Sequence, residues 1–537
     1  MSPKDSLEQA ESVQHDENAT SDAVANVGLL VNQEQHDETV LHALIHRPWT
    51  TLWIAYAIFV MLITSFDNGA GSTVISIPRF RQDYGSPYAG NFVLPSKWQS
   101  AYSGGPTAAT VLAAFAAGYI SDKIGRKLTY LICFVIVFVG ITLETVSHGS
   151  NAIFFGGKFI CGLAIGGFLS NSMTYIAEVS PLALRGIATA ASAVALALGP
   201  FIVSLLQNAY GTLESEWAYK SIFVAQYGIT AVALLIWPFM PESSTWLVSH
   251  DKEEQGLRTL KRFGQDANEA GRTVSNIKWT LEMASRETEG ASYLECFRKS
   301  NLRRTVVAIA PLSIQAFSGI LFAAYTTYYT ELAGYSIEES YRINIGGQVL
   351  AMGGNITSWF LIDRVGRRDL TFWGVVLITI VLTITGGLGT VPERSYIQGT
   401  VALLLMYAFL YNATIGATAY TALSEIATSR LRAKTTSLGL MLQSALFTMW
   451  AFVLPYIFNP DKANLGAKTA FIFAGTSMIC CVYLWFCHPE TAGRSLEELD
   501  EMFIKRIPAR KFKAYITEAE QSGAEIKKQK DQEESRS

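Results

Sequence analysis

The chain has 537 residues, half of them hydrophobic and only 16% charged, and its formal net charge is −3. This composition fits a large soluble enzyme as well as a membrane protein, so segment length has to decide between them. No sequence pattern speaks for a nucleic-acid partner, and the six scattered cysteines have neither disulfide nor metal-ligand spacing, so neither a metal nor a cofactor is expected.

The N-terminal tail, residues 1–48, is predicted to be disordered and cytosolic. Its first 46 residues are acidic and polar, and they contain no apolar run fit for a signal peptide. The first membrane helix must therefore serve as the insertion signal.

Apolar stretches of about 20 residues, the length that a helix needs to cross a bilayer, recur along the rest of the chain. We count twelve, near residues 49–72, 100–120, 128–147, 152–177, 187–207, 219–240, 303–331, 343–362, 370–390, 397–424, 434–458 and 467–488. They form two sets of six, residues 49–240 and 303–488, separated by a charged, partly helical linker, residues 241–302, and followed by a tail, residues 489–537. The predicted fold class is all-α, with twelve transmembrane helices in two six-helix pseudo-repeats.

Two charged residues fall inside predicted spans, where a charge is a functional hypothesis by default. Asp67 stands late in the first span and Lys158 early in the fourth. An acid that pairs with a cation in a low-dielectric cavity can bind and lose a proton as the pairing changes, so we predict proton coupling by these two residues. The alternative for Asp67 is a helix end that faces outer water. Glu144 is nearer a span end, and we expect it to be exposed.

Basic residues gather in alternate short connections, at Lys123 to Lys127, at Arg185, at Arg364 to Arg368 and at Arg430 to Lys434. By the positive-inside rule, these connections, the linker and both termini are cytosolic. An even number of spans also requires both ends of the chain to lie on the same side.

The seventh span is rich in groups that can bind a neutral polyhydroxylated ligand. Gln315 and Tyr325 are interleaved there with small residues. Amides and hydroxyls hydrogen-bond to sugar hydroxyls, and aromatic faces stack on the C–H faces of a pyranose ring. The alternative is that these polar residues hold helices together.

Three short motifs of the first half recur in the second half, 241 to 248 residues later. The repeated pairs are SDKIGRK and IDRVGRR, EVSPLALR and EIATSRLR, and PESSTWL and PETAGRSL. This order and spacing indicate a duplicated six-helix unit, as in many secondary transporters.

The charged residues of the first two motifs are predicted to form a cytosolic gate, namely Asp122, Arg126, Glu178 and Arg185 with their counterparts Asp363, Arg367, Glu425 and Arg432. We expect Glu178 to partner Arg185, and Glu425 to partner Arg432, in ion pairs that hold the two halves together and break on inward opening. The alternative is a topology signal without a gating role.

From Trp49 to Phe503 the chain resembles the sugar porter family of the major facilitator superfamily. The resemblance rests on the paired Asp-x-x-Gly-Arg-Arg/Lys loops, the PES motif after span six, and the PET motif with LEELDEMF after span twelve. The stretches YTALSEIATSRLRAKT, YTTYYTELAG and NPDKANLGAKTAFIF most resemble fungal permeases for maltose and other α-glucosides. The resemblance implies the major facilitator fold.

The resemblance also implies roles for single residues. Asp67 matches the coupling aspartate, Gln315 the first glutamine of the sugar motif, and Tyr325 a gating tyrosine, while Tyr420 stands where many members carry a sugar-stacking tryptophan. Several positions depart from the hexose-carrier pattern: Ala316, Leu321, Ala193 and Pro200 replace amides, and Lys158 replaces an arginine.

The expected function is a plasma-membrane sugar/proton symporter that works by alternating access. Its expected partners are an α-glucoside or other oligosaccharide, the proton and the lipid bilayer, and we expect a monomer. Two alternatives remain, a non-transporting sugar sensor and a carrier of a non-sugar metabolite on the same fold. An enzyme is not expected, because the sequence contains no nucleophile elbow, phosphate loop or metal constellation.

Overall fold

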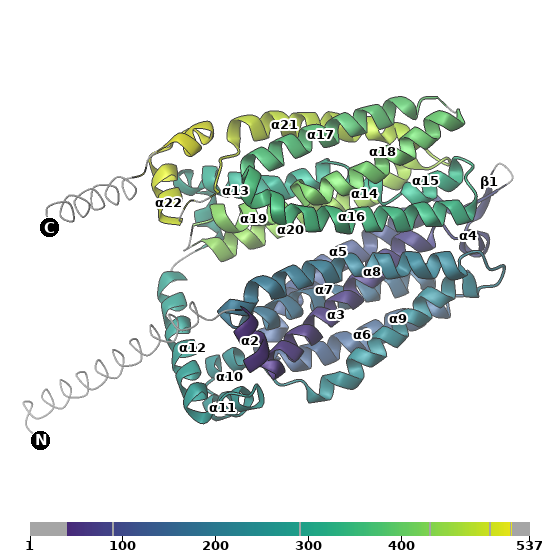
Figure 1. Cartoon of the computed structure of the whole chain (residues 1–537). Coiled ribbons are helices and arrows are strands. Elements are labelled where there is room, and N and C mark those ends of the chain that lie inside the picture. Colours follow the sequence, from purple (N-terminus) through teal and green to yellow (C-terminus); the bar gives the residue numbers. More distant parts are fainter. Residues whose placement is uncertain are drawn as a thin grey trace, which may run out of the picture.

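The computed structural model describes residues 40–517 except 89–90, 289–291, 392, 429–430, 493, 495 and 516. Most of the predicted N-terminal tail and the last 20 residues of the C-terminal tail therefore lie outside the described residues. Two helical bundles stand side by side, one built from the first half of the chain and one from the second (Figure 1).

The first bundle has six long helices, α3 (Pro48–Val74), α5 (Ser96–Ile124), α6 (Arg126–Thr145), α7 (Asn151–Val179), α8 (Leu182–Tyr210) and α9 (Trp217–Ile236). The second contains α13 (Lys299–Phe317), α14 (Ile320–Ala323), α15 (Thr326–Leu332), α16 (Ile337–Val365), α17 (Arg367–Leu388), α18 (Arg394–Ala413), α19 (Ile415–Ile426), α20 (Arg432–Phe458) and α21 (Ala470–Cys487). The segments α13 to α15 together form one broken traverse, and α18 with α19 forms another.

Shorter elements lie at the two ends of the bundles (Figure 1). At one end are α2 (Val40–His46), α10 (Ser244–Ser249), α11 (Glu253–Arg262), α12 (Ala267–Thr288) and α22 (Leu496–Ile504). At the other end are α4 (Pro78–Tyr84) and a hairpin of β1 (Ser86–Tyr88) and β2 (Asn91–Val93), in which Pro87 pairs with Phe92. Single 3₁₀ turns complete the described chain at Trp237–Phe239, Tyr293–Phe297, Gly466–Thr469 and Ala509–Ala514.

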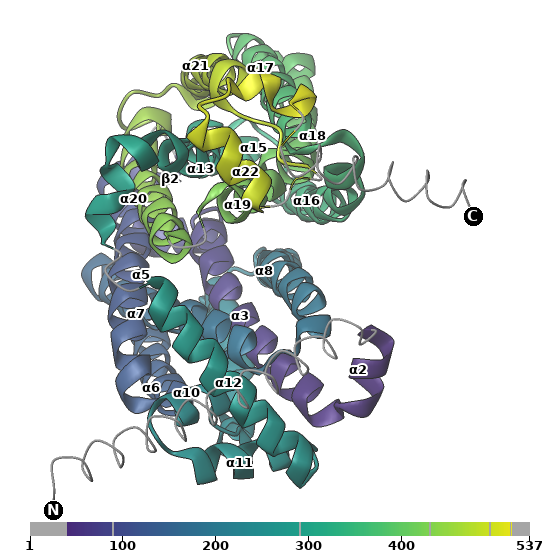
Figure 2. The same cartoon turned by 90° about the vertical axis from the view of Figure 1, so that its left-hand side faces the viewer.

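Ten helical segments of the described chain are long and apolar enough to cross a membrane. The other two predicted spans are α5 and α16, which are equally long at 29 residues each but more polar. Both lie where the bundles meet, since α5 packs on α20 and α16 packs on α8 (Figure 2). A helix that faces protein and an internal cavity needs fewer apolar residues than one surrounded by lipid.

Each bundle has its own hydrophobic core, and large apolar side chains also cover the outside. Leu235, Phe239 and Ile479, for example, expose more than 70% of their surface. Such side chains are unfavourable in water and favourable in hydrocarbon. The arrangement is that of a multi-pass membrane protein with the predicted all-α fold class.

Candidate functional site

The repeated motifs converge at the linker end of each bundle. Gly125 and Gly366 both have φ of 94°, a conformation that favours glycine, and each joins two long helices by a tight turn. A side chain at either glycine would collide with a carboxylate, that of Glu242 or Glu490. Each of these glutamates belongs to the PES or PET motif, to which the sequence analysis gave no role.

Glu242 and Glu490 cap equivalent helices. Glu242 accepts hydrogen bonds from the backbone N–H of Arg126 at 2.9 Å and of Lys127 at 3.1 Å. Glu490 accepts them from Arg367 at 2.9 Å and Arg368 at 3.2 Å. A carboxylate at a helix N-terminus satisfies free N–H groups and complements the helix dipole. Burial raises the pKa of Glu242, and these backbone hydrogen bonds oppose that shift.

Within the predicted gate cluster of the first bundle, Glu178 is paired with Arg126 and not with Arg185. Glu178 pairs with Arg126, with Nη2–Oε1 and Nε–Oε2 distances of 2.6 and 3.1 Å, and Asp122 lies 3.1 Å from the same guanidinium. Arg185 instead donates to the carbonyl of Ala177 at 3.4 Å. Glu178 ends α7 and Arg185 begins α8, and the intervening turn leaves Glu178 facing the start of α6.

In the second bundle, Arg367 lies 3.2 Å from Glu425. The partner of Glu425 is therefore Arg367, whereas the sequence analysis expected Arg432. Thr491 donates to the other oxygen of Glu425 at 2.5 Å. The side chain of Asp363 lies outside the described residues. These ion pairs join helices within one bundle, whereas the sequence analysis expected them to hold the two halves together.

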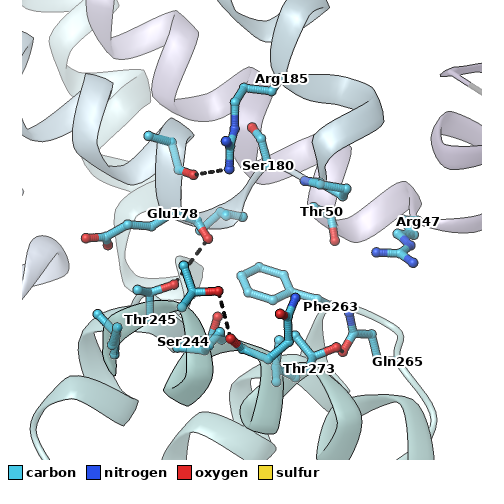
Figure 3. Close-up of a pocket in the computed structure, with 18 of the residues that line it drawn as sticks. Arg47, Thr50, Glu178, Ser180, Arg185, Ser244, Thr245, Phe263, Gln265 and Thr273 are labelled. Atoms are coloured by element: carbon cyan, nitrogen blue, oxygen red, sulfur yellow. Dashed lines mark hydrogen bonds between the residues drawn. The ribbon is translucent and has the colours of Figure 1, made fainter. Parts of the chain in front are cut away.

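A cavity of about 450 Å³ lies beside the first of these clusters, between the ends of α7 and α8 and the linker helices (Figure 3). Glu178 and Arg185 border it on the bundle side, and Phe263 and Thr273 border it on the linker side. Arg47 also lines it and pairs with Glu269 of α12 at 3.1 Å. The linker contacts the first bundle beside the gate residues, because Thr245 donates to the backbone carbonyl of Glu178 at 3.4 Å.

Asp67 and Lys158, the two charges that the sequence analysis placed inside spans, meet inside the first bundle. Lys158 Nζ lies 3.0 Å from Asp67 Oδ1, and the two side chains expose 1% and 3% of their surface. Gln226 of α9 donates to the same Asp67 oxygen at 3.1 Å. The alternative of an aspartate facing outer water is excluded by this burial.

Glu144 belongs to the same cluster, so the expectation that it is exposed is wrong. Its side chain has no exposed surface, and Oε2 lies 3.3 Å from Lys158 Nζ. Helix α7 covers it because Gly157 lets the backbones approach: a side chain at that glycine would lie 2.8 Å from Glu144 Cγ. Glu144 and Gln226 were detectable as polar residues within apolar spans, and the sequence analysis did not use that signal.

Gln315 lies where two broken helices meet in the second bundle. Helix α13 stops at Phe317 and Gly319 has φ of 94°, while α18 and α19 are interrupted at Thr414. Gln315 donates to the carbonyls of Ile415 and Gly416, at 3.0 and 3.1 Å. It therefore joins helices, which the alternative interpretation anticipated, at a site with unwound backbone of the kind that lines transporter cavities.

Tyr420 joins Gln315 through a residue that the sequence analysis missed. Gln443 of α20 donates to Gln315 Oε1 at 2.5 Å and to the Tyr420 hydroxyl at 3.3 Å. Both glutamines are buried, whereas Tyr420 exposes half of its surface. Tyr325 makes none of the hydrogen bonds of this network, and its ring packs against Phe458 with centroids 5.3 Å apart.

Contacts between the bundles gather at the end away from the linker. Arg81 of α4 and Glu331 of α15 form an ion pair of 2.6 Å whose side chains expose 12% and 5% of their surface. Ser96 donates to Asp461 at 2.5 Å through its hydroxyl, so α5 is tied to the chain that follows α20. At the same end, Asn344 of α16 donates to Gln207 of α8 at 3.3 Å. This end is closed in the structure.

The sequence of this chain is similar to those of known transporters. The sequence model of the family described as "Sugar (and other) transporter" matches residues 53–503. The general alpha-glucoside permease of Saccharomyces cerevisiae is 28% identical over 523 residues, which cover 96% of this chain and 84% of that protein. The alpha-glucosides permease MPH3 of the same species is 30% identical over 483 residues, which cover 87% and 79%.

Among solved structures, the inward-open conformation of the xylose transporter XylE from E. coli superposes with a TM-score of 0.68. It covers 84% of this chain and 99% of that chain, at 18% identity. At that identity the likeness establishes the fold alone, which is the major facilitator fold predicted from the sequence.

Proposed function

Because the chain belongs to the sugar transporter family, we propose that it carries an α-glucoside or another oligosaccharide together with a proton by alternating access. The observation that carries the proposal is the buried contact of Asp67 with Lys158. We further propose that the protein works as a monomer in the plasma membrane, with both termini in the cytosol. Membership of this family also agrees with the expectation that the chain is not an enzyme.

Proton coupling is supported by the position of Asp67. Its carboxylate is held by the Lys158 ammonium and by the Gln226 amide, both at about 3 Å, inside an apolar bundle. Adding a proton to Asp67 removes one half of the ion pair and so changes how strongly α3 and α7 hold each other. A carboxylate with this property can link proton binding to a change in helix packing.

The sugar selectivity is supported by the relatives, which are named as α-glucoside permeases, and by the Gln315 network. Gln443 supplies an amide beside Gln315, while Ala316 and Leu321 keep the apolar side chains that depart from the hexose pattern. The roles of Gln315, Tyr325 and Tyr420 in sugar binding are part of the proposal.

Alternating access is supported by the uneven distribution of contacts between the bundles. The outer end is held by Arg81 with Glu331 and by Ser96 with Asp461. The ion pairs at the linker end, such as Arg126 with Glu178, are internal to one bundle and leave it free to move as a unit. We assign the gate residues to this end and propose that they keep each bundle rigid during the cycle.

Uptake of labelled maltose by the Asp67→Asn variant tests the proposal in a transport-null host. The amide keeps the packing of α3 but cannot carry a proton, so accumulation against a gradient and alkalinisation of the medium should be lost while exchange across the membrane persists. Glu393→Gln, a neutral substitution at an exposed residue, is the matched control. A variant that still concentrates the sugar refutes the role of Asp67.

The same assay on the wild-type protein separates the alternatives. Binding of maltose without uptake would indicate a sensor. Absence of both binding and uptake for every α-glucoside tested would favour a carrier of a non-sugar metabolite.

A further inference from the structure

One ammonium faces two buried carboxylates in the first bundle. Lys158 Nζ lies 3.0 Å from Asp67 Oδ1 and 3.3 Å from Glu144 Oε2. Asp67 comes from α3, Lys158 from α7 and Glu144 from the last turn of α6, so three helices contribute to the cluster. A simple ion pair would need only two of them.

Among the described residues, no second cation faces Glu144. From α7 it is faced by Lys158 and by the thiol of Cys161, whose sulfur lies within 4.8 Å of one of its carboxylate oxygens. From α3 it is faced by Asp67, and from α9 the cluster is completed by Gln226, which donates to Asp67, and by the ring of Phe223, 5.5 Å from Lys158 Nζ. Lys158 is the one cation that lies against Glu144 among the described residues, with Nζ 3.3 Å from Oε2.

The charges of this cluster do not cancel when both carboxylates are ionised. One ammonium and two carboxylates sum to a charge of minus one in an apolar interior, which is unfavourable, and a single added proton makes the cluster neutral. Both carboxylates face one ammonium, so the charge on either one affects how readily a proton adds to the other.

We propose that Glu144 is a positioning residue for proton coupling, which stays with Lys158 as its counter-ion when Asp67 takes up the transported proton. This inference rests on the proposed proton symport. A proton from water adds to the Asp67 carboxylate, and Lys158 keeps its charge and its contact with Glu144. When the proton returns to water, Asp67 again shares Lys158 with Glu144.

The consequence concerns the pH at which the proposed transported proton binds. With Glu144 present, Asp67 can be protonated without leaving Lys158 unpaired in the bundle. Without that carboxylate, Lys158 has Asp67 as its one remaining counter-ion in the described cluster, which holds Asp67 in its ionised form. Loss of the Glu144 charge should therefore make Asp67 harder to protonate.

The test is the pH profile of initial maltose uptake between pH 4 and 8, measured for the full-length protein in a transport-null host. In Glu144→Gln we expect the midpoint of the profile to move to lower pH by about one unit or more, the size of shift that a neighbouring charge produces. In Glu144→Asp the shorter side chain holds the carboxylate farther from Lys158, so the midpoint should move in the same direction by a smaller amount. Glu338→Gln, at an exposed glutamate on α16, is the matched control and should keep the wild-type midpoint.

The outcomes distinguish this inference from the proposed function. A midpoint that is unchanged, or that moves to higher pH, in a Glu144→Gln protein that still exchanges maltose overturns the role of Glu144 and leaves symport standing. If Glu144→Gln fails to reach the membrane, an unchanged midpoint in Glu144→Asp overturns it. Wild-type uptake that does not depend on pH refutes symport and this inference together.

Discussion

A buried ion pair between Arg81 and Glu331 bridges the two bundles at the end away from the linker, which we propose faces the outside. The Arg81 guanidinium also lies over the ring of Tyr328, 5.9 Å from its centroid. Substitution of Arg81 by methionine keeps an apolar side chain of similar length but leaves the Glu331 carboxylate, which exposes only 5% of its surface, without its partner. Removing one partner of a buried pair costs about 3–5 kcal/mol.

That cost falls on the outward-closed state, because opening the outer end returns Glu331 to water. At about 1.4 kcal/mol per factor of ten, Arg81→Met should raise the ratio of outward-open to outward-closed protein about a hundredfold or more. Ser340 gives a suitable reporter position, since it has no exposed surface in the closed state and its hydroxyl accepts and donates no hydrogen bond among the described residues.

The assay is the rate at which a membrane-impermeant thiol reagent labels Ser340→Cys from outside the cell. We expect faster labelling when Arg81→Met is added, and a return toward the slow rate in the charge-swapped protein Arg81→Glu with Glu331→Arg. Arg81→Met without the reporter controls for the six native cysteines. A labelling rate that Arg81→Met leaves unchanged would show that the ion pair does not hold the outer end closed.

Two other predictions concern the sugar network and the helix caps. Gln315→Ala and Gln443→Ala should each weaken the apparent affinity for maltose about tenfold, because a lost buried hydrogen-bond partner costs about 1–3 kcal/mol. Competition binding measures this affinity. An unchanged affinity in both variants would mean that the ligand binds elsewhere. Glu242→Ala should lower the free energy of unfolding by about 1–2 kcal/mol through loss of the α6 cap. Thermal unfolding of the purified protein measures it, and an unchanged midpoint contradicts the capping role.

The features that follow from local pattern could be predicted from the sequence. Span length, the two sets of six and the repeated motifs led to the fold class, because a bilayer imposes a minimum length on every apolar helix. Asp67 and Lys158 were singled out because charges inside a membrane are rare, and the resemblance to the family implied that they are partners.

The features that depend on how helices approach one another could not be predicted from pattern alone. Glu144 looked like a helix-end residue, and it is buried because Gly157 allows α7 to cover it. Glu178 was grouped with Arg185 at the cytosolic helix ends, whereas packing of α6 on α7 brings Arg126 to it. Arg81 and Glu331 are 250 residues apart, and no local signal connects them.

The positions of the ion pairs bear on how a transport cycle could be driven. In the proposed cycle each bundle moves as a unit, so a pair inside one bundle, such as Arg126 with Glu178, is kept and does not select between states. A pair between bundles, such as Arg81 with Glu331, would break when that end opens and would therefore set the balance between states. The Asp67 cluster is internal to the first bundle, so its protonation can shift this balance only by altering the packing of α3, the helix that leads directly into α4 and Arg81.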